Sequence, residues 1–227
     1  MVIIRWLVIV VFICCLSSCM DGPTIYAPVS DVSTIDKIPK TGSHRVLPGE
    51  TLYSIAWRYG LDTRYLAQRN HLFRPYHVYA GQVIYLQGHT AWSPPETVIA
   101  DAEPAAAVDQ WQWPAQGDVV GNFSGLNKGI NIDGEAGDPI YAAAAGRVVY
   151  SGSGLRGYGN LIIIEHNDLF MTAYAHNTDV VVKEGDRVKS GQKIAEMGKT
   201  GAQRVMLHFE IRRSGQPVDP LTYLSER

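Results

Sequence analysis

His176 and His208 lie beside or within strongly apolar runs in the second half of the chain, where their imidazoles could bind a metal. A hydrolytic zinc site needs about three protein ligands from imidazole, thiolate or carboxylate groups, together with a bound water. Met206 lies two residues before His208, and side chains on a strand repeat every second residue, so both face the same way. A thioether cannot accept a proton, and Met206 therefore supplies no general base there. The remaining histidines occur singly, without the spacing of metal ligands, and are expected at the surface or in packing contacts: His44, His71, His77, His89 and His166.

Strands must position these side chains, because the chain from Trp113 onward is dense in β-branched residues. Turns that contain glycine recur about every eight to twelve residues, and helical periodicity is weak, which is typical of an all-β sandwich or barrel. The clearest predicted strands cover residues 147–150, 161–166, 170–175 and 207–211. We therefore predict an all-β unit over residues 111–227.

Several runs in this unit resemble the LytM, or lysostaphin-type, family of zinc peptidases. They are NKGINI at 127–132, AGRVVYSG at 145–152, GYGNLIII at 157–164, YAHN at 174–177, VKSGQKIAEMG at 188–198 and LHFEI at 207–211. The match extends from about residue 113 to the end of the chain. It implies the fold of that family, the duplicated hybrid motif.

In active members of that family, zinc is held by a histidine, an aspartate and the second histidine of a His-x-His pair, and two further histidines serve catalysis. The resemblance puts Asn127, Asn131 and His208 at the ligand positions, and Met206 and His176 at the catalytic positions. Asparagine is a neutral amide and a poor zinc ligand, so losing two ligands should empty the site. We therefore expect no catalytic residue, no metal, no other cofactor and no enzyme activity.

The same positions are predicted to form a groove that binds a partner protein. The groove residues are Asn127, Asn131, Tyr174, His176, Met206 and His208. In it, His176 and His208 are expected to hydrogen-bond each other or Glu210. One alternative keeps a metal, because Asp133 shares a strand face with Asn131, but it lies one pleat repeat away, about 6–7 Å. Residues 185–192 alone also suggest a biotin- or lipoyl-carrier domain, although no exposed lysine hairpin accompanies them.

A smaller unit is predicted over residues 43–87. Thr51 can cap a helix whose apolar side chains recur at helical spacing, Gly60 can end it, and Asp62 can cap a second helix. Strands at 44–47 and 81–86 flank the two helices. This β-α-α-β order, with VLPGETLYSIA near its start and GQVIYL at its end, resembles a LysM domain. The expected fold is thus a small α+β LysM module followed by the all-β unit.

The LysM resemblance implies binding to the N-acetylglucosamine-containing glycan strands of peptidoglycan. The sugar would lie between two loops, with contacts from Gly49, Glu50, Thr51, Leu52, Arg74, Pro75 and Tyr76. An aromatic edge suits a sugar face, and backbone amides suit the acetamido group. Phe73 and Tyr76 either supply that edge or complete a small core.

The N-terminus is predicted to be a lipoprotein signal peptide at residues 1–18. Arg5 precedes an apolar run at 6–16, which spans only about 16 Å as a helix, well short of the roughly 30 Å bilayer core. The run closes on Leu-Ser-Ser-Cys, which resembles a bacterial lipobox and implies lipidation of Cys19, although an ordinary cleavage site beside a cysteine would look similar. No second cysteine would then remain for a disulfide, and Met20 favours export to the outer membrane.

Residues 19–42 are rich in Pro, Ser, Thr and Asp and are predicted to be a flexible tether. Residues 88–110 are predicted to be a semi-extended linker that separates two independent units. The chain has 20 basic and 22 acidic residues, so there is no basic excess to indicate a nucleic-acid partner.

Together these features resemble a family of outer-membrane lipoproteins that activate murein hydrolases. The resemblance implies a non-catalytic protein, anchored by lipid and facing the periplasm, that binds glycan strands. Its groove would free the active site of a periplasmic N-acetylmuramoyl-L-alanine amidase during septal wall splitting in cell division. Two alternatives remain open at this point: a working zinc endopeptidase of the wall, and a purely structural wall tether.

Overall fold

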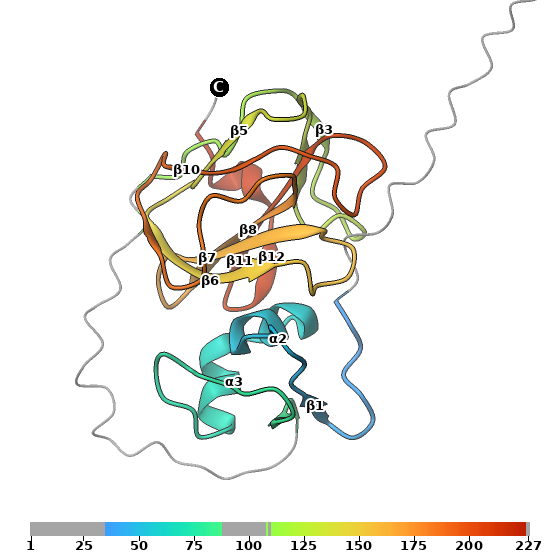
Figure 1. Cartoon of the computed structure of the whole chain (residues 1–227), viewed down its shortest axis with the longest axis vertical. Helices are drawn as coiled ribbons and strands as arrows, with labels where there is room; N and C mark the ends of the chain where they lie inside the picture. Colours follow the sequence, from blue (N-terminus) through green and yellow to red (C-terminus); the bar gives the residue numbers. More distant parts are fainter. Residues whose placement is uncertain (1–34, 88–107, 109, 226–227) are drawn as a thin grey trace, which may run out of the picture.

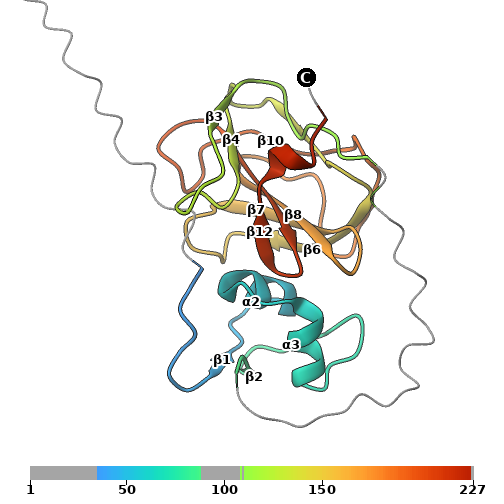
Figure 2. The same ribbon diagram turned by 180° about the vertical axis from the view of Figure 1, so that it is seen from behind.

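The computed structural model describes residues 35–87, 108 and 110–225, which form two packed units (Figures 1 and 2). The predicted signal peptide, Cys19 and most of the predicted linker lie outside the described residues. Within those ranges, the helices are all too short and too polar to cross a bilayer.

The first unit contains two strands and two helices. They are β1 Ser43–Arg45, α2 Leu52–Tyr59, α3 Thr63–Arg69 and β2 Val83–Tyr85. The strands pair antiparallel, and α2 begins in a capping box in which Thr51 and Ser54 bond each other's backbone N–H. Gly60 ends α2 in the left-handed region, at a φ of 62°, and Asp62 caps α3. The predicted β-α-α-β order is confirmed.

The end of the predicted tether packs against this unit. Ile38 lies against its core, and Asp36 N–H donates to the carbonyl of Arg58 at 2.9 Å. The side chain of Ile35 covers Gly60. The prediction of a flexible tether is therefore wrong for residues 35–42, because two isoleucines leave water by closing over the module.

The second unit contains a large antiparallel sheet and a two-stranded sheet. The large sheet has the order β3-β4-β11-β8-β7-β6-β9, with β12 beside β11, and the small sheet pairs β5 with β10. The elements are β3 Val119–Gly121, β4 Ile130–Ile132, β5 Pro139–Tyr141, β6 Gly146–Gly152, β7 Asn160–Glu165, β8 Phe170–Asn177, β9 Arg187–Val188, β10 Lys193–Glu196, β11 Leu207–Arg213, β12 Gln216–Val218 and the 3-10 helix η2 Pro220–Thr222. The prediction of an all-β unit is confirmed.

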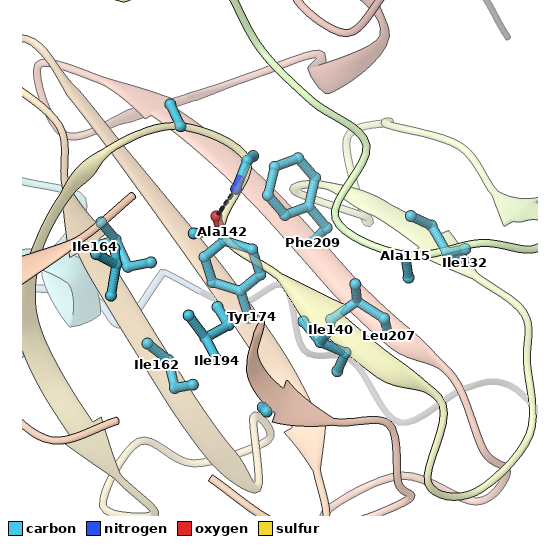
Figure 3. Packing of buried hydrophobic residues seen from close by; sticks show 14 of the residues in the cluster. Ala115, Ile132, Ile140, Ala142, Ile162, Ile164, Tyr174, Ile194, Leu207 and Phe209 are labelled. Carbon is cyan, nitrogen blue, oxygen red and sulfur yellow. Dashed lines mark hydrogen bonds between the residues drawn. The ribbon is translucent and has the colours of Figure 1, made fainter. Parts of the chain in front are cut away.

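The main core of this unit lies between the two sheets (Figure 3). Ile140 of β5 and Ile194 of β10 meet large apolar side chains from the large sheet. On β11, alternation turns Leu207 and Phe209 toward this core, and the residues between them toward the other face. That other face of β11 carries the polar residues discussed below.

Helix α2 of the first unit packs on this second face of the large sheet (Figures 1 and 2). Tyr53 and Trp57 of α2 join a buried cluster with Leu161, Ile163 and Met171. Strand β7 is apolar on both faces, so each face of the sheet needs a cover. The prediction of two independent units is therefore wrong, because the first unit supplies one of those covers.

Candidate functional site

His208 lies on β11 with no exposed surface, opposite Asn131 of β4. His208 Nδ1 lies 2.7 Å from Asn131 Oδ1, and His208 Nε2 lies 3.2 Å from Glu210 Oε1. The ring of His176 is adjacent, with a centroid distance of 6.1 Å to His208. Its Nδ1 bonds the carbonyl of Thr200 at 2.9 Å. The expected hydrogen bond to Glu210 is therefore made by His208, and that of His176 goes to a backbone oxygen.

These groups do not fit a hydrolytic zinc. Both ring nitrogens of His208 are engaged by side chains, and Asn131 offers a neutral amide where an anionic ligand is needed. Asp133 pairs with Arg204 at 2.8 Å and is half-exposed, whereas the two histidines are buried. Across the described ranges, no three His, Cys, Asp or Glu side chains gather as metal ligands.

Tyr174 does not belong with the other predicted groove residues. Its side chain lies in the core between the sheets, where its hydroxyl accepts from Ala143 N–H at 2.8 Å and from Thr172 Oγ1 at 3.0 Å (Figure 3). The β7–β8 register shifts at this end of β8, and His176 has a φ of 68°. The expected alternation from 174 to 176 is thereby broken, so the two side chains do not share a face.

The remaining two groove residues differ in accessibility. Met206 is fully buried and pairs through its backbone with Gly198. Asn127 is partly exposed in the loop 122–129, and its amide donates to the carbonyl of Asn122 at 3.0 Å. Of the predicted groove residues, Asn127 is thus the one at the surface.

A series of buried polar groups continues from His208 along the same face of β11. Glu210 accepts from Tyr158 Oη at 2.6 Å and from Arg212 Nε at 2.9 Å. Arg212 donates to the Trp57 carbonyl at 2.7 Å, with its guanidinium 3.7 Å from the indole centroid. Trp57 Nε1 in turn donates to Tyr158 Oη at 3.2 Å. We call Asn131, His208, Glu210, Arg212, Tyr158 and Trp57 the polar chain. It connects Asn131 and His208, two of the predicted ligand positions, to helix α2.

The charges in the polar chain are set by burial and by their neighbours. Burial alone would raise the pKa of Glu210, but Arg212 and hydrogen bonds from His208 and Tyr158 lower it to about 2. Burial lowers the pKa of His176 to about 4, so its ring is neutral at pH 7. Arg212, Tyr158 and Trp57 are not among the site residues predicted from the sequence. The alternation His208-x-Glu210-x-Arg212 was the available signal, because it places three polar side chains on one face of a strand.

Acidification is expected to destabilise the protein. The unfolded chain protonates His176 near pH 6.5, whereas the folded chain does so only near pH 4. The free energy of unfolding is therefore unaffected by His176 above pH 6.5, and it falls by about 2–3 kcal/mol as the pH drops to 4. His166, whose pKa burial also lowers to about 4, acts in the same direction. The loss from Glu210 begins only below pH 4.5.

Urea unfolding at pH 7, 5.5 and 4 checks this expectation. His176→Asn, which suits a positive φ, should show a smaller fall in unfolding free energy than the parent. His77→Asn, at an exposed position, should show the full fall. An equal fall in the parent and His176→Asn would contradict the assignment of a buried neutral ring.

The predicted glycan-binding residues lie at the junction of the two units. Leu52 is fully buried in the core of the first unit, so its side chain is not available to a sugar and any contact would come from its backbone. Thr51 donates to the Val149 carbonyl at 3.2 Å, and Arg74 forms ion pairs with Glu165, at 3.4 Å, and with Asp168. Both predicted loops therefore face the second unit.

Comparison with known proteins relates both units to described families. The LysM domain family matches residues 44–87, and peptidase family M23 matches residues 125–220. A Pseudomonas aeruginosa protein named lipoprotein NlpD/LppB homolog is 42% identical over 232 residues, covering 82% of this chain and 78% of its own length. This chain belongs to the NlpD family.

The chain is also similar to two further relatives and to a solved structure. Murein hydrolase activator NlpD of Salmonella typhimurium is 37% identical over 258 residues, covering 82% of this chain and 68% of its own. The uncharacterized lipoprotein YgeR of Escherichia coli is 43% identical over 201 residues, with 80% of each chain covered. A zinc-containing peptidase from Vibrio cholerae shares 29% identity and a TM-score of 0.46 over 48% of this chain and 39% of that one. The predicted pairing of LysM and LytM units in an NlpD-like chain is confirmed.

Proposed function

We propose that this NlpD-family chain is a non-catalytic outer-membrane lipoprotein, anchored through Cys19 and facing the periplasm. It binds peptidoglycan through its LysM unit and activates a periplasmic N-acetylmuramoyl-L-alanine amidase during septal wall splitting. The observation that carries the proposal is the 2.7 Å contact between Asn131 and His208. Two former ligand positions bond each other, and such an arrangement supports binding of a partner in place of catalysis. The name of the Salmonella relative, murein hydrolase activator, also supports the proposal of an activator.

The partner must first contact the rim of the groove. His176, Met206 and His208 have no exposed surface, so an amidase segment reaches them only after the covering loops move. Leu126 is 76% exposed in the loop 122–129, beside Asn127. An exposed leucine beside these polar residues suits the apolar side of an inhibitory helix or loop. We therefore place the first contact of the amidase at Leu126 and Asn127.

Leu126→Lys is expected to reduce amidase activation roughly tenfold, because the charge would have to be desolvated against an apolar partner surface. The measurement is release of dye from labelled peptidoglycan by a purified amidase, with and without the full chain in detergent. Val181→Lys is the matched control, since Val181 is 59% exposed on a loop outside the groove. It should activate as the parent does.

Three results would overturn the proposal in different places. If the parent leaves amidase activity unchanged, activation is wrong and a structural tether is favoured. If Leu126→Lys activates as well as Val181→Lys, the placement of the contact is wrong. If the purified chain carries one zinc per molecule and cuts wall peptides without an amidase, the non-catalytic assignment is wrong.

A further inference from the structure

A small open pocket of about 140 Å³ lies between the two units. One wall comes from the first unit, through residues 49–51 and 75–78 together with Tyr53. The opposite wall comes from the second unit, through Arg147 and Val149 of β6 and through Glu184. The two loops predicted to bind glycan therefore open onto side chains of the peptidase-like unit.

Arg147 is one side chain of this pocket with unused hydrogen-bonding capacity. Its Nε is buried and lacks a hydrogen-bond partner among the described atoms. Because this Nε is closed off from solvent, a ligand in the pocket would accept from the terminal amino groups of the same guanidinium. Glu184 lies on the same wall and offers a carboxylate acceptor to the pocket.

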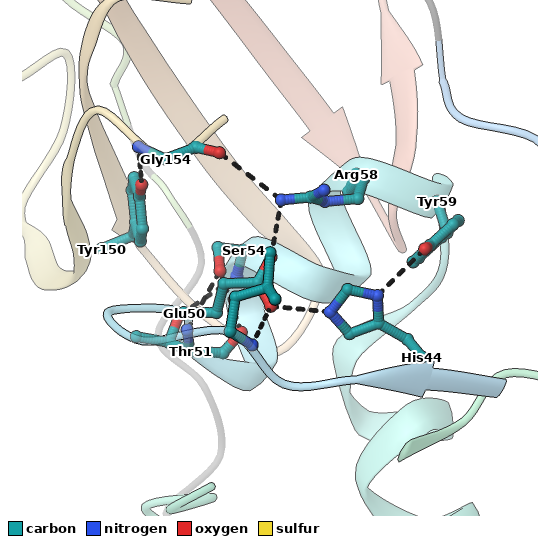
Figure 4. Close-up of polar contacts among 9 residues, drawn as sticks. His44, Glu50, Thr51, Ser54, Arg58, Tyr59, Tyr150 and Gly154 are labelled. Atoms are coloured by element: carbon teal, nitrogen blue, oxygen red, sulfur yellow. Dashed lines mark hydrogen bonds and ion pairs between the residues drawn. The ribbon is translucent and has the colours of Figure 1, made fainter. Parts of the chain in front are cut away.

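Glu50 also lines the pocket, but its carboxylate is already bonded to other residues of the first unit (Figure 4). Its carboxylate bonds His44 and Arg58 at 2.6 Å each, and accepts from Leu47 N–H at 2.8 Å. Arg58 extends from this cluster to the carbonyl of Gly154 in the second unit, at 3.5 Å. Glu50 therefore holds the loop in place, and Arg147 and Glu184 are left to face a ligand.

The lining indicates the class of ligand. One guanidinium and one carboxylate on the same wall balance in charge, so an anion or a cation gains little there. A neutral molecule with hydroxyl and amide groups can bond both. Tyr76 is partly exposed at the pocket and adds an aromatic surface for a sugar face or an acetamido methyl. The volume is below the roughly 300–1,000 Å³ of pockets for drug-sized ligands, so one sugar residue enters and the rest of a strand lies outside.

We propose that the sugar site is shared between the two units, with Arg147 and Glu184 of the peptidase-like unit bonding a neutral N-acetylated sugar held by the LysM loops. This inference rests on the proposed binding of peptidoglycan. It makes glycan binding and the docking of the two units mutually dependent, since a ligand that touches both stabilises the docked arrangement.

The test is titration of the full chain in detergent with a soluble trimer of N-acetylglucosamine, followed by calorimetry. Arg147→Met keeps the length of the side chain and removes its donors, and should weaken binding roughly tenfold. Glu184→Gln should weaken binding by a smaller factor. Arg187→Met is the matched control, because Arg187 pairs with Arg147 across β6 and β9 but is exposed and does not line the pocket. It should bind as the parent does.

A second measurement, by proton NMR, distinguishes loss of the Arg147–sugar contact from separation of the two units. The indole N–H signal of Trp57, which donates to Tyr158, reports whether the units remain packed in each variant. Weaker binding by Arg147→Met with an unchanged Trp57 signal supports the shared site. Unchanged binding by Arg147→Met, or weakening only where the Trp57 signal moves, overturns it and leaves glycan binding by the LysM loops intact. A parent that does not bind the trimer overturns the proposed glycan binding itself.

Discussion

Arg212→Met is expected to lower the free energy of unfolding by about 3–5 kcal/mol. Arg212 is almost fully buried and pairs with Glu210, which has no exposed surface. Removing the guanidinium leaves the Glu210 carboxylate in the interior without its cation, and it also removes the donor to the Trp57 carbonyl. Urea unfolding at pH 7 measures the loss, and the Glu210 pKa, measured by carbon NMR in the same variant, should rise from about 2.

Two further variants show whether the buried charge is the cause. Arg213→Met changes the next residue on β11, which is exposed, and should cost less than about 0.5 kcal/mol. Glu210→Met combined with Arg212→Met removes both charges and should recover much of the loss, because an apolar pair of similar volume needs no partner. If the double variant is as unstable as Arg212→Met, packing and not an unpaired carboxylate explains the loss.

Trp57→Ala is expected to separate the two units and to cost about 3–5 kcal/mol of unfolding free energy. Its indole is 1% exposed and packs between α2 and the large sheet, where it also lies under Arg212. Truncation removes the largest apolar surface of the junction and the donor to Tyr158. Small-angle scattering should show a larger radius of gyration than in the parent, and urea unfolding should split into two transitions.

Tyr65→Ala is the control for loss of an aromatic ring from the same unit, since Tyr65 is 51% exposed on α3. It should leave the radius of gyration and the single transition unchanged. A Trp57→Ala variant that scatters as the parent does would show that the junction does not depend on this side chain. The remaining inter-unit contacts, such as Gln216 to the Gly60 carbonyl at 2.7 Å, would then suffice.

Arg212 and Trp57 are neighbours in the polar chain. Trp57 lies on the LysM helix, and the polar chain runs from it through Arg212 and Glu210 to His208 and Asn131. The face of the sheet that carries His208 is therefore also the face on which the first unit docks. A partner that displaces the first unit, or a glycan that holds it, would change the environment of His208 through this chain.

Local patterns predicted the elements of both units well. The caps of α2 and α3 follow from Thr51, Gly60 and Asp62, whose side chains or backbone act within four residues. The alternation on β11 follows from the pleat of a strand and needs no distant partner. The direction of His176 was not predictable in this way, because a register shift and a positive φ break the alternation.

The sequence by itself determined which groups are present: amides at 127 and 131, a thioether at 206 and imidazoles at 176 and 208. The chemical nature of these groups does not depend on the fold, and amides and a thioether at these positions already argue against a hydrolytic zinc. Only the tertiary structure decided that Tyr174 belongs to the core, that His208 is closed in by Asn131 and Glu210, and that the LysM unit covers the sheet. Sequence patterns could not show these contacts, because such patterns act over short distances along the chain. Patterns of period 2 or 3.6 report on a few neighbours, whereas the contact between Trp57 and Arg212 joins residues 155 positions apart.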